Sequence, residues 1–340
     1  MTTVLEAINS ALYKALDCDE HVLLIGEDLL DPYGGAFKVT RGLSSAFPGR
    51  VLTTPISESG FLGMATGMAL RGMRPVVELM FGDFTTLIAD QLINHATKFR
   101  WMYNDQVRVP LVIRTPMGGR RGYGPTHSQT LEKHFIGAPG LWVLAPNAIS
   151  DPGKLLLHAI FDLDDPVLFI ENKLLYSKEI GDVKRLKEFT IKEENKHKSS
   201  IRSSLTLSLR ESPPPKLTIV AYGYMSELAR QATLRLAYES EIFTELVIPT
   251  QISPFEINSI LDSVQSTGRM LVVEEGTRTL GWGAEIIARA FESAQSRLIS
   301  ADRLTAPDLP IPASVPLETK FLPGVEDIID SAKLIVKRVP

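Results

Sequence analysis

The sequence predicts an α/β protein in which a doubly wound, mostly parallel sheet is followed by a second, smaller α/β domain. Short runs of Val, Ile and Leu alternate with segments of helical spacing, and the runs lack the strict polar alternation of half-exposed strands. A polar segment closed by three prolines separates two such regions. We therefore expect domains at residues 1–177 and 217–340, joined by a polar linker at residues 178–216.

Composition excludes several classes of function. The chain has 340 residues, 44% of them hydrophobic, and a formal net charge of −4 with both signs dispersed. This charge gives no reason to expect binding to nucleic acid or to a membrane surface, and no apolar run has membrane-spanning length. The single cysteine, Cys18, excludes an internal disulfide. Since the first residues lack the positive charge of a signal peptide, we expect a cytoplasmic location or a reduced organelle matrix, and no secretion.

Within residues 1–177, helical patterns separate the apolar runs. Five of these runs predict strands that are buried on both faces, namely residues 21–28, 74–81, 109–115, 141–146 and 166–172. The chain opens with a helical pattern from Val4 to Leu16. The clearest later helix is expected at residues 84–102, where Leu87, Ile88 and Leu92 share a face.

The second region repeats the alternation after the linker. Strands are expected at residues 216–223, 243–249 and 269–276, with helical patterns between them at residues 226–240 and 253–264. Ser226 and Ser253 are expected to be the N-caps of these two helices, with Glu256 completing a capping box for the second.

Common catalytic signatures are missing from the sequence, which contains no GxGxxG, GxxxxGK[ST], GxSxG or HExxH motif. The notable loop is "MGGRRGYGPTHSQ" at residues 117–129, where four glycines allow the backbone to approach a ligand closely while His127 stands nearby. A plain turn with a solvated histidine has the same composition.

A second candidate is the carboxylate of Glu58 in "PISESG", which lies between a strand-like run and a helix of small residues. The simplest hypothesis is structural: Ser57 caps the helix, and the helix dipole stabilises Glu58. A functional hypothesis needs more than this one position.

Taken together, seven segments resemble the β subunit of the thiamine diphosphate-dependent decarboxylating component of 2-oxo-acid dehydrogenase complexes. This family has a transketolase-like pyrimidine-binding domain and a transketolase C-terminal-like domain. The similarity covers residues 3–176 and resumes with "KLTIVAYG", "LVVEEGTRTLGWGAEI" and "LPIPASVPLETKFLPGVEDII". The seven colinear segments are "GEDLLDPYGGAF", "TPISESGFLGMATGMALRGMRPVVELMFGDF", "DQLINHATKFRWM", "VPLVIRTPMGG", "THSQTLEKHF", "PGLWVLAPN" and "DPVLFIENKLLY".

The resemblance assigns roles to four residues. Glu58 matches the glutamate that binds the aminopyrimidine ring of thiamine diphosphate and helps the cofactor to lose its thiazolium proton. Phe84 matches the family's aromatic residue that lies against the aminopyrimidine, and Met80 is expected near it at the same strand end. His127 matches the histidine that faces the substrate and helps to deliver the acyl group to lipoamide, either by orienting it or by transferring protons.

The resemblance also implies ions and partners. A potassium ion would be held by oxygens of Leu111, Ala159, Ile160 and Asp162, although "FDLDDP" makes the alignment there ambiguous by one residue. The family's GDG segment with its later paired asparagines is absent, so an α subunit would hold the magnesium and the diphosphate. The implied assembly is an α2β2 heterotetramer, in which the C-terminal domain forms the β–β contact and binds a lipoyl acyltransferase core.

Three alternatives remain open at this point. The chain could be the β subunit of an acetoin dehydrogenase, part of a split transketolase-like enzyme, or a non-catalytic scaffold subunit that keeps the pyrimidine-binding fold. Retention of Glu58, Phe84 and His127 together favours a catalytic subunit.

Overall fold

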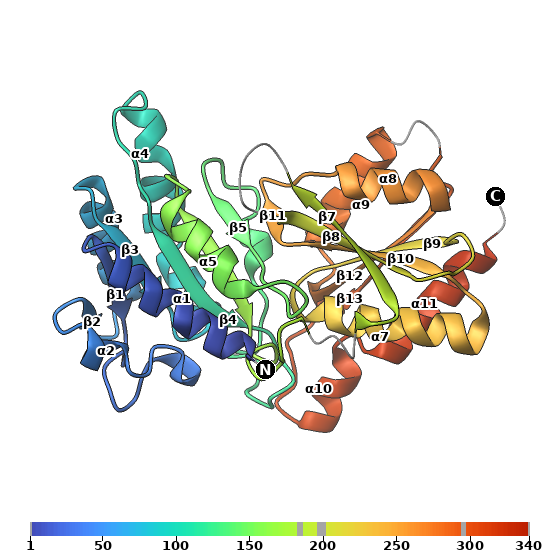
Figure 1. Cartoon of the computed structure of the whole chain (residues 1–340), viewed down its shortest axis with the longest axis horizontal. Coiled ribbons are helices and arrows are strands. Elements are labelled where there is room, and N and C mark those ends of the chain that lie inside the picture. Colours follow the sequence, from blue (N-terminus) through green and yellow to red (C-terminus); the bar gives the residue numbers. More distant parts are fainter. Residues whose placement is uncertain (1, 182–185, 196–201, 294–296, 339–340) are drawn as a thin grey trace. The chain divides into compact units, whose positions relative to one another are not determined.

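The structure of the chain, a computed structural model, describes residues 2–181, 186–195, 202–293 and 297–338 (Figure 1). The described residues form two compact units. Unit 1 comprises Met1–Gly118, His134–Ile180 and Ile252–Pro254. Unit 2 comprises Gly119–Lys133, Gly181–Gln251 and Phe255–Pro340. The glycine-rich loop therefore belongs with unit 2, although its sequence position lies inside the first expected domain.

Unit 1 contains a seven-stranded sheet in the order β11-β5-β6-β4-β3-β1-β2. The pairs from β5 to β2 all run parallel, and β1, β3, β4 and β6 are almost wholly buried, which confirms the doubly wound parallel sheet. The short strand β11 was not predicted, and β2 was expected only as a strand-like run before Glu58 without stated bounds. The bounds are β1 (Val22–Gly26), β2 (Val51–Thr53), β3 (Arg74–Glu78), β4 (Val112–Met117), β5 (Trp142–Leu144), β6 (Val167–Asn172) and β11 (Gln251–Ser253).

Two capped helices pack together in unit 1. The helix α1 (Val4–Cys18) begins with a capping box, in which the Glu6 N–H donates to Thr3 Oγ1 at 3.2 Å and the Thr3 N–H donates to Glu6 Oε2 at 2.8 Å. It contacts α5 (Pro152–Phe161), which is capped by the Asp151 side chain. The remaining α-helices of this unit are α2 (Leu43–Ala46), α3 (Glu58–Leu70) and α4 (Thr97–Met102).

The single helix expected at residues 84–102 is divided into three pieces. A 3₁₀ segment, η2 (Gly82–Ile88), is followed by a π-helical turn, η3 (Gln91–Ala96), and then by α4. Hydroxyl groups of threonine compete for backbone carbonyls here: Thr85 donates to the Gly82 carbonyl at 2.7 Å, and Thr97 donates to the Ile93 carbonyl at 2.9 Å. The apolar spacing indicated helix correctly but could not reveal these changes in winding.

Unit 2 contains a six-stranded mixed sheet in the order β13-β12-β9-β10-β8-β7. The helices α8 and α9 lie on one face of this sheet, and α7 and α11 lie on the other (Figure 1). The strand bounds are β7 (Phe189–Asn195), β8 (Arg202–Leu209), β9 (Leu217–Ala221), β10 (Thr244–Pro249), β12 (Arg269–Thr277) and β13 (Ser300–Ala306). The helix bounds are α7 (Gly223–Ser240), α8 (Asn258–Thr267), α9 (Trp282–Ser293), α10 (Val315–Phe321) and α11 (Val325–Lys337).

The segment expected to be a linker contains two strands. β7 and β8 pair antiparallel with each other, and β8 pairs antiparallel with β10, so these residues extend the sheet of unit 2. Leu205 and Leu207 are buried, while Thr206 between them is half-buried, which is the alternation of an antiparallel strand. The overall polarity of the segment concealed this short alternation. Residues 182–185 and 196–201 of the expected linker lie outside the described residues.

Both expected N-caps in unit 2 were wrong. The helix α7 already begins at Gly223, and the Ser226 hydroxyl inside it donates to the Gly223 carbonyl at 2.6 Å. The helix α8 begins at Asn258, whereas Ser253 lies in β11 and its hydroxyl donates to the Ile136 carbonyl at 2.7 Å. Serine hydroxyls satisfy carbonyls as readily as they cap helices.

A buried ionic cluster links Arg114, in the middle of β4, to the carboxyl ends of β3 and β6. Arg114 is 2% exposed and donates to both oxygens of Glu171, at 2.7 and 2.9 Å, and to Glu78 Oε2 at 2.7 Å. The Tyr176 hydroxyl donates to Glu171 at 2.6 Å, and the Ala36 N–H donates to Glu78 Oε1 at 2.6 Å. Burial lowers the pKa of Arg114, but the charges of Glu171 and Glu78 outweigh it and raise the pKa overall.

We expect Arg114→Met to lower the free energy of unfolding by about 3–5 kcal/mol, because Glu78 and Glu171 would stay buried without their shared cation. Urea unfolding of the chain measures this loss. Arg108→Met is the matched control, since its partly exposed ion pairs contribute less than about 1 kcal/mol. Equal losses in the two variants would contradict a structural role for the buried cluster.

Candidate active site

Glu58 is the first residue of α3, and its side chain is only 6% exposed. The preceding Ser57 is the N-cap residue, but its side chain forms no capping hydrogen bond with the described residues. The structural hypothesis that Ser57 caps this helix is therefore not supported. The buried carboxylate of Glu58 lies at the positive end of the helix dipole.

A second buried carboxylate lies near Glu58. Glu27 directly follows β1 and is 6% exposed, and its Oε1 has no hydrogen-bond partner in the described part of the chain. Burial raises the pKa of Glu27, and the charges of Glu58 and Asp28 raise it further. The raised pKa favours the protonated form of the Glu27 carboxyl. Glu27 was not among the predicted site residues, although an acidic residue at the end of a buried parallel strand is a recognisable signal.

Met80 and Phe84 lie just beyond the carboxyl end of β3, and both are half-buried. The Phe84 ring packs edge-to-face on the Phe81 ring, with 5.9 Å between their centres. The segment η2 also contacts α3, where the Ser59 hydroxyl donates to the Leu87 carbonyl. Unit 1 therefore brings the elements that carry Glu58 and Phe84 into contact.

Only a glycine can occupy position 82 in this arrangement. A Cβ atom there would lie 2.2 Å from Met117 Cγ, at the end of β4. The absence of a side chain lets η2 approach β4 closely, and this approach sets the position of the aromatic residues that follow β3.

His127 lies on the glycine-rich loop of unit 2, Gly119–Lys133. Its side chain is half-buried, and its Nδ1 is 3.0 Å from Thr126 Oγ1. Its N–H donates to the Gly124 carbonyl at 3.3 Å, which closes a turn. Glu58, Met80 and Phe84 belong to unit 1, so the predicted site residues are carried by both units.

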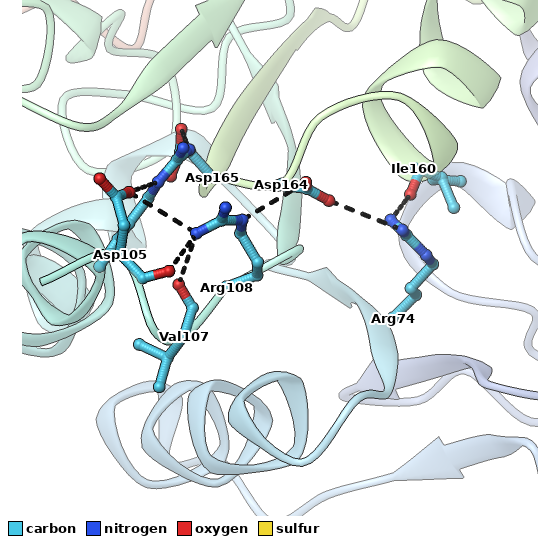
Figure 2. A network of polar contacts seen from close by, with 8 residues as sticks. Arg74, Asp105, Val107, Arg108, Ile160, Asp164 and Asp165 are labelled. Atoms are coloured by element: carbon cyan, nitrogen blue, oxygen red, sulfur yellow. Dashed lines mark hydrogen bonds and ion pairs between the residues drawn. The ribbon is translucent and has the colours of Figure 1, made fainter. Parts of the chain in front are cut away.

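Three of the four residues expected to hold a cation, Ala159, Ile160 and Asp162, lie at the end of α5, and Figure 2 shows the network of polar contacts that includes Ile160. Arg74 Nη1 donates to the Ile160 carbonyl at 2.7 Å, and Arg74 Nη2 lies 3.7 Å from Asp164 Oδ1. Arg108 Nε lies 3.7 Å from the other oxygen of Asp164. The Ile160 carbonyl therefore already accepts a hydrogen bond from a cation that belongs to the chain.

Two further members of the expected cation site are engaged elsewhere. The Leu111 carbonyl accepts the Val167 N–H at 2.8 Å, as part of the pairing between β4 and β6. Asp162 Oδ2 lies 2.5 Å from His158 Nδ1. Potassium, like other hard cations, needs several converging oxygens, and the Arg74 charge would repel a second cation at this corner. These contacts weigh against a potassium ion here, but a carbonyl oxygen has a second lone pair, and the site formed by backbone oxygens stays a prediction.

The described ranges contain neither a metal-binding cluster nor a membrane-spanning helix. In these ranges no three or more His, Cys, Asp or Glu residues gather in a way that could hold a metal ion. In the same part of the chain, no helix combines the length and the apolar character needed to cross a bilayer.

Comparison with known proteins identifies two family domains and many relatives. Residues 1–178 match the transketolase pyrimidine-binding domain, and residues 208–328 match the transketolase C-terminal domain. The chain is 37% identical to subunit beta-1 of the mitochondrial pyruvate dehydrogenase E1 component of Arabidopsis thaliana, over 97% of this chain and 88% of the relative. Identity to the beta subunit of the pyruvate dehydrogenase E1 component of Rickettsia conorii is 35%, over 98% of each chain.

Two other similarities extend this comparison. The chain is 34% identical to the beta subunit of the acetoin:2,6-dichlorophenolindophenol oxidoreductase of Cupriavidus necator, over 97% of this chain and 96% of that one. A solved structure described as a split gene transketolase, inactive beta4 tetramer, has a TM-score of 0.73 at 18% identity, and covers 98% of this chain and 97% of that chain. The last similarity bears on the fold alone.

We expect the melting temperature of the chain to be the same in potassium chloride and sodium chloride at equal ionic strength, because Arg74 already supplies the positive charge at Ile160. Arg74→Leu should lower the stability by about 1–3 kcal/mol in both salts, through loss of a charged hydrogen bond. Arg71→Leu, an exposed arginine nearby, serves as the control. A rise in the melting temperature that is specific to potassium would show that the ion binds.

Proposed function

Because the chain belongs to the family of pyruvate dehydrogenase E1 β subunits and their relatives, we propose that it is the β subunit of a thiamine diphosphate-dependent 2-oxo-acid dehydrogenase component. The reaction is the oxidative decarboxylation of pyruvate or a related 2-oxo acid, with transfer of the acyl group to lipoamide. The observation that carries this proposal is Glu58, a carboxylate buried at a helix start beside a second buried carboxylate.

Glu58 suits the cofactor by its chemistry and by its surroundings. When bound, thiamine diphosphate supplies a nucleophilic carbon and then takes up the charge that decarboxylation leaves behind. Glu58 would donate and accept a proton at a ring nitrogen of the aminopyrimidine. The region around Glu58 contains a buried polar atom, Glu27 Oε1, that forms no hydrogen bond with any other described residue. Phe84 and Met80 would contact the same ring from the end of β3.

Exposed apolar side chains support the requirement for an α subunit. Ile56 is 84% exposed two residues before Glu58, and Met64 on the outer side of α3 is 44% exposed. Gly60, Gly63 and Gly67 are also exposed along this helix. An apolar helix of this kind is normally covered by protein on all sides, which supports a partner that packs over the Glu58 region. That α subunit would supply the magnesium ion and the diphosphate ligands in an α2β2 assembly.

Sequence similarity favours His127 for the second half of the reaction. We assign His127 to the substrate side, where an imidazole can hold or move a proton while the acyl group passes to lipoamide. The lipoyl group would come from an acyltransferase core. The β–β contact expected in such an assembly belongs to this proposal as well.

An acetoin dehydrogenase β subunit is the second candidate, because the beta subunit from Cupriavidus necator is nearly as similar as the pyruvate dehydrogenase subunits. One experiment separates the two functions. The chain is produced together with the α subunit of the same organism and assayed with pyruvate, branched-chain 2-oxo acids and acetoin, using an artificial electron acceptor. Turnover of none of these substrates would reject the proposed function.

We expect Glu58→Gln to slow hydrogen exchange at the reactive carbon of thiamine diphosphate by roughly 10²- to 10⁴-fold in the assembled enzyme, because an amide cannot exchange the required proton. Nuclear magnetic resonance of cofactor exchanged in deuterated buffer measures this rate. Glu20→Gln, which changes an exposed glutamate, is the control. Unchanged exchange in Glu58→Gln would reduce the residue to a structural role at the start of α3.

We expect His127→Ala to reduce acylation of a lipoyl domain by roughly 10²-fold or more while leaving cofactor affinity nearly unchanged. The measurement compares two assays of the same assembly: turnover with an artificial acceptor, which reports the early steps, and lipoyl acylation, which reports transfer. His134→Ala provides an exposed histidine as the control. Wild-type rates in both assays would mean that His127 takes no part in the reaction.

A further inference from the structure

The loop that carries His127 is held by a buried carboxylate from a distant part of the sequence. Glu318 lies on α10, and its side chain is completely buried. Its Oε1 accepts the Arg120 N–H at 2.8 Å, and its Oε2 accepts the Gly122 N–H at 2.8 Å. Each oxygen of this one side chain therefore binds the backbone of the same loop.

A second carboxylate holds the beginning of the loop. Glu275, near the end of β12, accepts the Gly119 N–H at 2.6 Å. Backbone N–H groups that point together in this way form a concave site for anions, and hydrogen bonds to carboxylates are about twice as strong as neutral ones. The turn at residues 119–122 is thus fixed by two side chains that lie far from it in sequence.

The backbone of this turn needs such support. Arg120 has φ +68°, in the left-handed region that residues other than glycine rarely adopt. A Cβ atom on Gly119 would lie 2.6 Å from Leu322 Cδ1 and 2.9 Å from Glu318 Oε1, so a side chain there would displace these two side chains. The left-handed conformation of Arg120 costs free energy. The hydrogen bonds to Glu318 offset this cost.

The contacts continue from this turn towards His127. A Cβ atom on Gly122 would lie 3.1 Å from Val315 Cγ2, and one on Gly124 would lie 3.4 Å from Ala313 Cβ. The loop therefore rests directly on the residues that begin α10. The turn closed by the His127 N–H starts at Gly124, so the place of the imidazole depends on where α10 holds the preceding glycines.

We propose that Glu318 is a positioning residue for the acyl-transfer step, acting through the backbone of Arg120 and Gly122 to keep the His127 imidazole in one place. This inference rests on the proposed function and on the role assigned to His127. Glu318 itself touches neither substrate nor cofactor in this scheme. A loss of about 1 Å in placement of a reacting group can cost roughly 10²-fold in rate, so loosening the loop is expected to matter.

Glu318→Gln tests the first half of the proposal without any enzymatic assay. The amide keeps one acceptor oxygen but turns an NH₂ donor towards a backbone N–H, so one of the two hydrogen bonds is lost. We expect hydrogen exchange at residues 119–127 to speed up by about 10-fold or more, with the rest of the chain unchanged. Glu245→Gln is the matched control, because its carboxylate accepts the Ser208 hydroxyl at 2.8 Å in the sheet of the same unit.

The second half is tested in the assembly with the α subunit. Glu318→Gln should lower lipoyl acylation by roughly 10- to 100-fold while cofactor affinity stays at the wild-type level. The double variant Glu318→Gln/His127→Ala should transfer no more slowly than His127→Ala alone, because Glu318 acts through His127. A purely structural contribution would instead give additive losses and weaker cofactor binding.

The outcomes separate this inference from the proposed function. An active wild-type assembly combined with unchanged loop exchange in Glu318→Gln, or with additive losses in the double variant, overturns the role of Glu318 and leaves the function standing. A wild-type assembly that turns over neither 2-oxo acids nor acetoin overturns both. Faster loop exchange together with the non-additive loss of transfer supports the inference.

Discussion

The parallel sheet of unit 1 depends on one guanidinium between two carboxylates. Arg114, in the middle of β4, binds carboxylates at the carboxyl ends of β3 and β6, the edge where ligand sites form in open α/β sheets. Through Glu78 the same cluster reaches the Ala36 N–H, and Gly35 beside it has no space for a side chain because a Cβ atom would meet Glu78 Oε1 at 2.5 Å. The cluster thus fixes the ends of β3 and β6 relative to the loop after β1. The residues that follow β1 and β3 are therefore held in defined positions.

Most of the fold could be predicted from the sequence because buried parallel strands have a strong signal. All eight expected apolar runs contain strands. The elements that were not predicted are those whose secondary structure depends on contacts with neighbouring elements more than on their own sequence pattern. β7 and β8 are polar strands within an apparent linker, and the short strand β11 has too few residues for a pattern. The winding of residues 82–102 changes at threonine hydroxyls, which periodicity does not detect.

The site was predictable only in part. Resemblance located Glu58 and His127, and their burial and local contacts accord with a functional site without testing it. Residues that act on these two were missed for different reasons. Glu27 had a signal, an acid at the end of a buried strand. Glu318 had no signal in the sequence, because the Gly122 and Arg120 N–H groups that it binds lie 196 and 198 residues before it.

The two units are interleaved along the chain, and this affects how the protein is made. The chain passes from unit 1 to unit 2 at Gly119 and returns to unit 1 at His134. It passes to unit 2 again at Gly181, and Ile252–Pro254 are the last residues that it adds to unit 1. Its edge strand β11 is therefore synthesised after β7, β8, β9 and β10 of unit 2. A ribosome that has produced the first 180 residues carries a sheet that still lacks an edge strand, and an exposed sheet edge is prone to pair with other chains. The sheet of unit 1 thus keeps an unpaired edge while β7 to β10 of unit 2 are being translated.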